Sequence, residues 1–144
     1  MPVDLEFIHG GAGVLLLCRD VVKGREMNKA NELLLGSAER IRDLRFALVD
    51  MRRATSVEAS TDEIRFFAYQ DRRIAAVTPS GLLVAVVAEQ PLAYGLARMW
   101  EAFADEIAWE TQAFRSGAAA ETWLRMRVKE KFKVELAVES KLLP

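Results

Sequence analysis

The chain has 144 residues, with 20 basic and 21 acidic side chains and a net charge of −1. This length fits one domain with a single hydrophobic core, and the charge balance lacks the basic excess that nucleic-acid binding requires. A single cysteine excludes an internal disulfide, and the N-terminus has no basic region followed by an apolar one. The longest apolar run, residues 81–88, is far shorter than the roughly 20 residues of a transmembrane helix. We therefore expect a reduced, cytoplasmic protein with no transmembrane segment and no nucleic-acid partner.

The N-terminal part of the sequence predicts a β-hairpin followed by a helix. Two apolar strands, residues 4–8 and 14–22, flank a glycine-rich segment that suits a tight connection. No Lys-Ser or Lys-Thr pair follows these glycines, so a hairpin is favoured over a phosphate-binding loop. Over residues 24–41 apolar side chains recur at steps of three and four, which indicates an amphipathic helix. The Gly-Ser pair at residues 36–37 interrupts this helix.

Three apolar strand candidates follow, and each leads directly into a helix start. They span residues 45–51, 81–88 and 109–114, and Asp50 lies at the carboxyl end of the first. The first of these candidates is a nearly continuous apolar run, which is typical of a strand that is covered on both faces in a mostly parallel sheet. The order of elements predicts an α/β fold. In it an N-terminal β-hairpin precedes three strand-helix units, which form a mixed sheet with a parallel core.

Local signals mark where the helices begin. After a polar loop over residues 52–59, Ser60 and Glu63 have the spacing of a capping box. Pro91 suits the first position of the next helix, which has the clearest apolar stripe in the chain. The last helix is expected from residue 118 to about residue 128.

The C-terminal tail is expected to be an accessory element. Residues 132–138 alternate between apolar and mostly charged side chains, which favours an amphipathic strand, although the Lys and Glu content is also compatible with a helix. Such a strand can cover a sheet edge of its own subunit or exchange with a partner subunit. We therefore divide the chain into a domain of residues 1–128 and a tail of residues 129–144.

Several segments of the chain resemble the bacterial STAS-like, SpoIIAA-like proteins. The resemblance extends over about residues 5–124. It is carried by VLLLC at 14–18, ALVD at 47–50, STDEI at 60–64, LAYGLARM at 92–99, WET at 109–111 and FRS at 114–116. It implies a small α/β domain related to the sporulation anti-sigma-factor antagonists and, more distantly, to the CRAL-TRIO lipid-transfer fold.

The resemblance also implies a candidate position for phosphorylation. In the antagonists, a serine at the start of the helix after the central strand is phosphorylated to switch partner binding. The matching positions here are Ser60 and Thr61. The Asp-x-Ser-x-Gly signature of the antagonists is absent, since no glycine accompanies Ser60. The alternative is that Ser60 serves only as a helix cap.

Polar residues are expected to gather at one edge of the sheet. In open α/β sheets, ligands bind outside the carboxyl ends of the parallel strands. Tyr94 and Arg98 lie one helical turn apart and together suit an anion or a carbonyl group. Alternatively, Tyr94 seals the sheet edge while Arg98 pairs with Glu101 or Asp105. The candidate binding residues are Asp50, Arg52, Arg53, Tyr94, Arg98, Arg115 and Ser116.

Other residues have chemistry of their own. Asp71 falls on the core-facing side of its helix, either as a buried carboxylate of a functional site or at the border of the core beside Arg72 or Arg73. Cys18 lies in an apolar strand and is expected to be a buried thiol. His9 is the single histidine, so neither a multi-histidine metal site nor a Ser-His-Asp triad can form within one subunit. The larger aromatic side chains either fill the core or wall an apolar cavity. They are Phe66, Phe67, Trp100, Phe103, Trp109 and Trp123.

These observations favour a non-enzymatic regulatory or binding module that needs no cofactor and no metal. We expect it to recognise a protein partner or a small apolar or amphipathic ligand at the carboxyl edge of the sheet, and peripheral contact with a membrane is compatible with this role. A second hypothesis is an enzyme that uses Asp50, Tyr94 and Arg98 on a small carbonyl or phosphate substrate. A third is a structural homodimer that exchanges residues 132–138.

Overall fold

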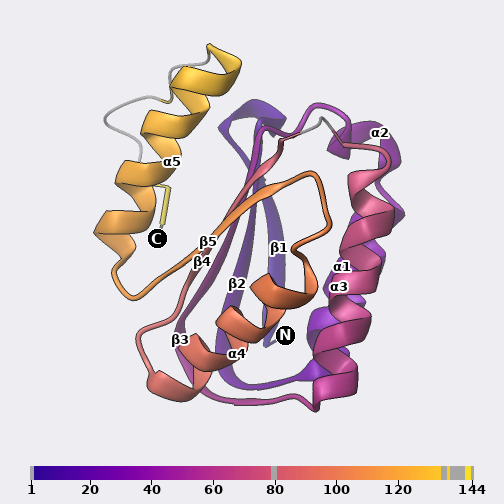
Figure 1. Ribbon diagram of the computed structural model, residues 1–144, viewed down its shortest axis with the longest axis vertical. Coiled ribbons are helices and arrows are strands. Elements are labelled where there is room, and N and C mark those ends of the chain that lie inside the picture. The colour runs from indigo at the N-terminus through magenta and orange to yellow at the C-terminus, as the bar shows by residue number, and fades with distance from the viewer. Residues whose placement is uncertain (1, 79–80, 134–135, 137–141, 144) are drawn as a thin grey trace.

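A five-stranded mixed sheet forms the centre of the molecule, in the order β1-β2-β3-β4-β5 (Figure 1). The computed structural model describes residues 2–78, 81–133, 136 and 142–143. β1 and β2 are antiparallel, and each later strand is parallel to its neighbour. The strands are β1 (Val3–Ile8), β2 (Gly13–Lys23), β3 (Phe46–Glu58), β4 (Leu83–Val87) and β5 (Glu110–Phe114). The predicted hairpin and mixed sheet with a parallel core are confirmed.

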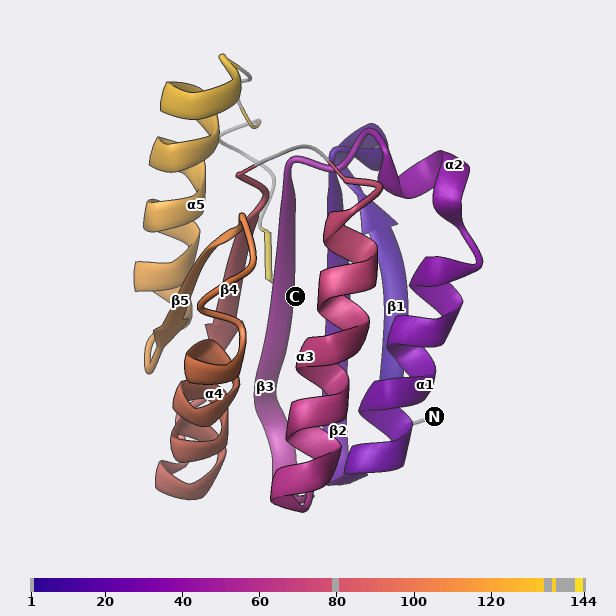
Figure 2. The ribbon, with the colours of Figure 1, turned by 45° about the vertical axis from the view of Figure 1, so that its right-hand side comes forward.

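Helices cover both faces of this sheet (Figure 2). On one face lie α1 (Gly24–Leu35), α2 (Ala38–Ile41), α3 (Thr61–Ala75) and α4 (Pro91–Phe103). On the opposite face lies α5 (Gly117–Phe132). Within the residues that the structure describes, no helix combines the length and the apolar character needed to cross a membrane.

The hairpin connection is a short 3-10 turn, η1 (His9–Gly11). Gly10 and Gly11 have φ angles of 64° and 93°, which glycine adopts at little steric cost. Gly13 then begins β2 directly against the ring of Phe46, and a Cβ at this position would overlap that ring. Glycine is therefore required here by the close approach of β2 and β3.

The prediction of a polar loop over residues 52–59 is wrong, because β3 continues as a strand to Glu58. The reason lies in β2, which runs on to Lys23 and supplies a parallel partner for the polar half of β3. Ala54 and Val57 point into the core from this half. Shifts in the β2–β3 register accommodate the irregular spacing of these apolar residues. Asp50 consequently lies inside β3, between Leu17 of β2 and Val87 of β4, and not at a strand end.

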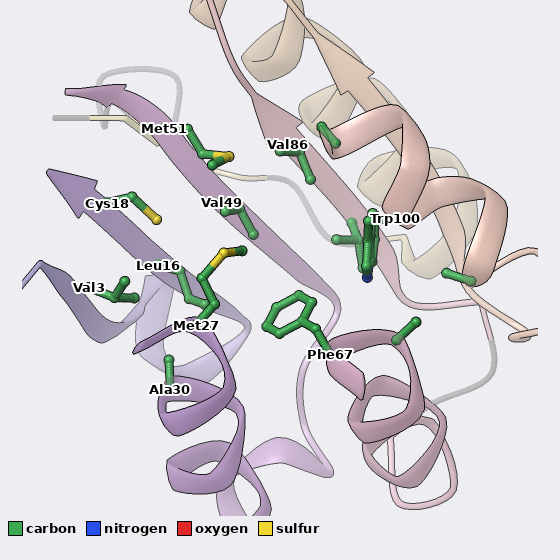
Figure 3. Packing of buried hydrophobic residues seen from close by; sticks show 14 of the residues in the cluster. Val3, Leu16, Cys18, Met27, Ala30, Val49, Met51, Phe67, Val86 and Trp100 are labelled. Atoms are coloured by element: carbon green, nitrogen blue, oxygen red, sulfur yellow. The ribbon is translucent and has the colours of Figure 1, made fainter. Parts of the chain in front are cut away.

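Two apolar layers hold the helices to the sheet. In the larger one, Met27 of α1, Phe67 of α3 and Trp100 of α4 point toward Val49 and Met51 of β3 (Figure 3). The smaller layer joins α5 to the other face of the sheet, where its fully buried residues include Leu48, Leu83, Leu124 and Val128. Leu136, Leu142 and Leu143 of the tail are buried in this second layer.

The closing helix is longer than expected. α5 starts at Gly117 and continues to Phe132, four residues past the expected end near residue 128. Phe132 therefore ends a helix and does not begin a strand, and Lys133 follows it in a left-handed conformation with φ 58°. Of the expected strand over residues 132–138, residues 134, 135, 137 and 138 lie outside the described residues. The tail as an edge strand or exchange arm stays a prediction, as does the domain division after residue 128.

Candidate functional site

Asp50 is fully buried and bonded to its near neighbour Arg52. Alternation along β3 places both side chains on the face covered by α5, on the same side as Leu48. One carboxylate oxygen of Asp50, Oδ1, accepts hydrogen bonds from the Arg52 backbone N–H at 3.1 Å and from Nε at 2.9 Å. The other, Oδ2, accepts a bond from Nη2 at 3.1 Å. The hydrogen bond from Arg52 to Asp50 raises the pKa of Arg52, so the two groups form a charged, two-pronged pair.

This ion pair lies beneath the start of α5. A Cβ added at Gly117 would stand 2.9 Å from Nη1 of Arg52, so the guanidinium occupies the space that a side chain would take. The charges of Glu89 and Glu121 also favour the charged form of Arg52 and raise its pKa. Glu121 accepts a hydrogen bond of 2.9 Å from the backbone N–H of Leu143. Arg52 thus connects β3 to the start of α5, where the end of the chain docks.

A second group of candidate residues lies between α4 and the end of β5. The guanidinium carbon of Arg115 stands 4.5 Å from the centre of the Tyr94 ring, which is a cation–π geometry. One turn further along α4, Nη1 of Arg98 lies 3.6 Å from Oε1 of Glu101. This confirms the pairing of Arg98 with Glu101 that was one of two expectations. We name Tyr94, Arg98 and Arg115 the rim patch.

The candidate set for an enzyme is divided between the two faces of the sheet. Tyr94 belongs to α4 and packs against the larger apolar layer, whereas Asp50 faces α5. Among the contacts of the described residues, Asp50 bonds to Arg52 while Tyr94 stacks with Arg115. Ser116 uses its hydroxyl oxygen to cap α5, accepting a 3.3 Å bond from the N–H of Ala119. Arg53 is exposed on the polar half of β3.

Asp71 is buried, so the expectation that it lies at the border of the core is wrong. Its Oδ1 accepts a hydrogen bond of 2.9 Å from Nδ2 of Asn31, on α1. Its Oδ2 accepts one of 2.7 Å from Nε1 of Trp100, on α4. Burial raises the pKa of Asp71 to about 7, and these two hydrogen bonds lower it only in part. The carboxylate joins three helices through two neutral donors.

Sequence reasoning identified the position of Asp71 but not its partners. Asn31 and Trp100 lie 40 and 29 residues away along the chain, and both look like ordinary helix residues in the sequence. One signal was available, since Asn31 is a polar residue on the apolar side of its helix, one position after Ala30. A buried amide on one helix and a buried carboxylate on the next are a reason to expect a hydrogen bond between them.

Two voids between the helices and the sheet are small. One void of about 30 Å³ is lined mainly by aliphatic side chains, together with Phe67 and Trp100. Another, of about 40 Å³, adjoins Asp71 and Trp109. Each has the volume of about one water molecule. The aromatic residues do not share one cavity, because Trp123 lies against Phe114 on the α5 side, with ring centres 5.5 Å apart.

Ser60 has the capping role expected of it. Its Oγ accepts a 3.1 Å hydrogen bond from the N–H of Glu63, and its own N–H donates one of 2.9 Å to Oε1 of Glu63. Ser60 and Thr61 are both exposed at the start of α3. Phosphorylation at either position stays a prediction.

Cys18 and His9 occupy the places expected from the sequence. Cys18 is fully buried, and burial raises the pKa of its thiol to about 12. His9 begins the hairpin connection, where burial and the charge of Arg125 lower its pKa. Over the described ranges, no three His, Cys, Asp or Glu side chains gather in an arrangement that could hold a metal ion.

Comparisons with protein-family models and with curated proteins give no match. A similar solved structure is that of an uncharacterized protein from Shewanella loihica PV-4, a member of the DUF3478 family with a SpoIIAA-like fold. The two chains are 15% identical, and the match covers 85% of this chain and 91% of that chain with a TM-score of 0.49. The SpoIIAA-like description agrees with the resemblance in the sequence, whereas the link to CRAL-TRIO proteins has no counterpart in it. The similarity concerns the arrangement of helices and strands, and the function has to be argued from this chain's own residues.

Proposed function

We propose that this chain is a non-enzymatic binding module that recognises a protein partner through the rim patch. One observation carries the proposal, namely the stacking of Arg115 over Tyr94 at 4.5 Å with Arg98 one helical turn away. Tyrosine and arginine are the side chains that most often dominate protein interfaces. Here they are held on a helix and at a strand end, and the side chain of Arg98 is 64% exposed.

The charge of the patch suggests the chemistry of the partner. Its two arginines are exposed, and among the described residues Glu101, which is half-buried, is the carboxylate that pairs with one of them. A partner that offers carboxylates beside an apolar side chain would satisfy both guanidinium groups and cover the Tyr94 ring. We therefore infer a protein surface or segment that is acidic and partly apolar.

The buried polar groups support binding over catalysis. Asp50 is held by Arg52 on the α5 side of the sheet, and Asp71 is enclosed by Asn31 and Trp100. The voids of about 30 and 40 Å³ are far smaller than the roughly 300 Å³ of a typical small-molecule pocket. A protein partner is accordingly favoured over a small apolar ligand enclosed in the core.

Selection from a displayed library of random peptides tests the proposal. We expect the immobilised chain to enrich peptides with Asp or Glu next to an apolar residue. Changing Arg115→Glu should weaken the binding of a selected synthetic peptide at least about tenfold, and Tyr94→Ala should weaken it similarly. Arg42→Glu, at an exposed arginine beyond α2, is the matched control and should bind as the parent does.

Two results would count against this function. One is a library that yields no acidic binder, and the other is a binder that is indifferent to both rim substitutions. Native mass spectrometry after incubation with a bacterial cell extract addresses the remaining alternative. A reproducible added mass of lipid size would support a small apolar ligand instead.

A further inference from the structure

The outward face of α3 carries an apolar stripe that the fold does not use. Phe66 and Tyr69 are 47% and 52% exposed, although both are large side chains. Their rings stack on each other, with centres 6.1 Å apart and planes inclined at 28°. They form one wall of an open groove of about 480 Å³ between α3 and α4, and Phe103 of α4 also lines this groove. Exposed apolar surface of this kind marks an interaction site.

The spacing of the exposed residues is that of a helix-pairing seam. Asp62, Phe66, Tyr69, Arg73 and Ala76 are all exposed and follow one another at steps of four, three, four and three. This alternation is the repeat by which two helices pack side by side. The opposite side of α3 holds Ile64, Phe67 and Asp71 against the sheet and its neighbouring helices. The seam thus faces away from the sheet and borders the open groove beside α4.

The charges on this seam are self-complementary. Asp62 lies in the first turn of α3, and Arg73 lies in the last. If two copies of α3 run antiparallel with their centres between Phe66 and Tyr69, each Phe66 meets Tyr69 of the second copy. The same register places each Asp62 opposite Arg73 of the second copy. In such an isologous contact every interaction occurs twice, and the two occurrences are related by a two-fold axis.

We propose that α3 is the interface of a homodimer, in which two copies of this chain pack their α3 helices antiparallel through this seam. Two flanking arginines do not oppose this arrangement, because each already has a carboxylate partner in its own chain. Nη1 of Arg65 lies 3.2 Å from Oδ1 of Asp62, which leaves Oδ2 of Asp62 to meet Arg73 of the second copy. Nη2 of Arg72 lies 3.7 Å from Oε2 of Glu106. The dimer is independent of the proposed rim function, since none of the rim patch belongs to α3. It would present two rim patches to a partner, which raises the avidity for a partner with two matching segments.

Light scattering and sedimentation equilibrium over about a hundredfold range of concentration test the interface. We expect the mass to approach twice the monomer mass of 16.2 kDa at the upper end of the range. Tyr69→Asp should leave a monomer throughout, and Phe66→Ser serves as a second variant at the seam. Met126→Asp changes a similarly exposed side chain on α5, across the sheet, and should dimerise as the parent does.

A charge swap tests the register itself. Asp62→Arg alone, or Arg73→Asp alone, places like charges opposite each other twice and should raise the dissociation constant about tenfold. The double variant restores opposite charges and should return to within about threefold of the parent. Circular dichroism confirms that each variant is folded. A monomeric parent, a dimer unaffected by Tyr69→Asp, or a double variant as weak as the single ones would overturn the proposal.

Discussion

The raised pKa of the buried Asp71 carboxyl predicts how the free energy of unfolding of this chain depends on pH. Its pKa is raised from 3.8 to about 7, with burial as the largest cause. Over the range between these two values, the folded chain holds a proton on Asp71 that the unfolded chain has already lost. The free energy of unfolding that Asp71 contributes is therefore highest below about pH 4 and decreases as the pH rises to about 7. Above that pH the contribution no longer changes.

The size of the effect follows from the two pKa values. A change from 3.8 to about 7 corresponds to a loss of at most about 4 kcal/mol across this range. Asp71→Asn removes the titration but introduces a cost of its own. An amide offers one acceptor oxygen where the carboxylate offers two, so either Asn31 or Trp100 loses its acceptor. That loss destabilises the variant by about 1–3 kcal/mol at every pH.

Urea unfolding of the parent and of Asp71→Asn, followed by tryptophan fluorescence at several pH values between about 5 and 8, measures how the free energy of unfolding changes with pH. The variant should be less stable than the parent at about pH 5, and the difference should shrink or reverse by about pH 8. Asp62→Asn is the matched control, since it changes a 91% exposed carboxylate on the same helix. If parent and Asp71→Asn lose the same stability between these pH values, Asp71 does not titrate there and the reasoning fails.

Three further predictions concern positions elsewhere in the fold. Because burial raises the pKa of Cys18 to about 12, its thiol should resist alkylation at about pH 8 until the chain unfolds, and rapid labelling of the native chain would contradict this. Gly13→Ala should cost about 1–3 kcal/mol in urea unfolding, because the new methyl group meets the ring of Phe46. Gly36→Ala is its control, because the added Cβ there stands 3.6 Å from the nearest carbonyl oxygens. Equal stability of the two variants would show that β2 and β3 move apart enough to accommodate the methyl group at residue 13. Ser60→Ala should lower the free energy of unfolding by about 1 kcal/mol, measured by thermal unfolding, because the helix cap is lost. Ser60→Thr keeps a hydroxyl and should retain most of the parent's stability. Equal stability of these two variants would exclude the capping role.

The sequence by itself determined the elements whose signals are local. The Ser60–Glu63 capping box and Pro91 at the first position of α4 act within one helical turn, so reading neighbouring residues was sufficient to place both helix starts. The apolar run at the start of β3 indicated a strand covered on both faces, and the helices on the two sides of the sheet explain that pattern. The order of these elements then predicted the mixed sheet with a parallel core.

Tertiary structure decided what depends on residues that are distant along the chain. The polar half of β3 became a strand because β2 supplied a parallel partner. The burial of Asp71 depended on donors from α1 and α4, which no local spacing could identify. Asp50 was placed at a strand end by its local context, yet the length of β3 enclosed it beside Arg52. Local patterns report which face of an element is apolar, whereas the partner of each polar group is set only when the elements pack together.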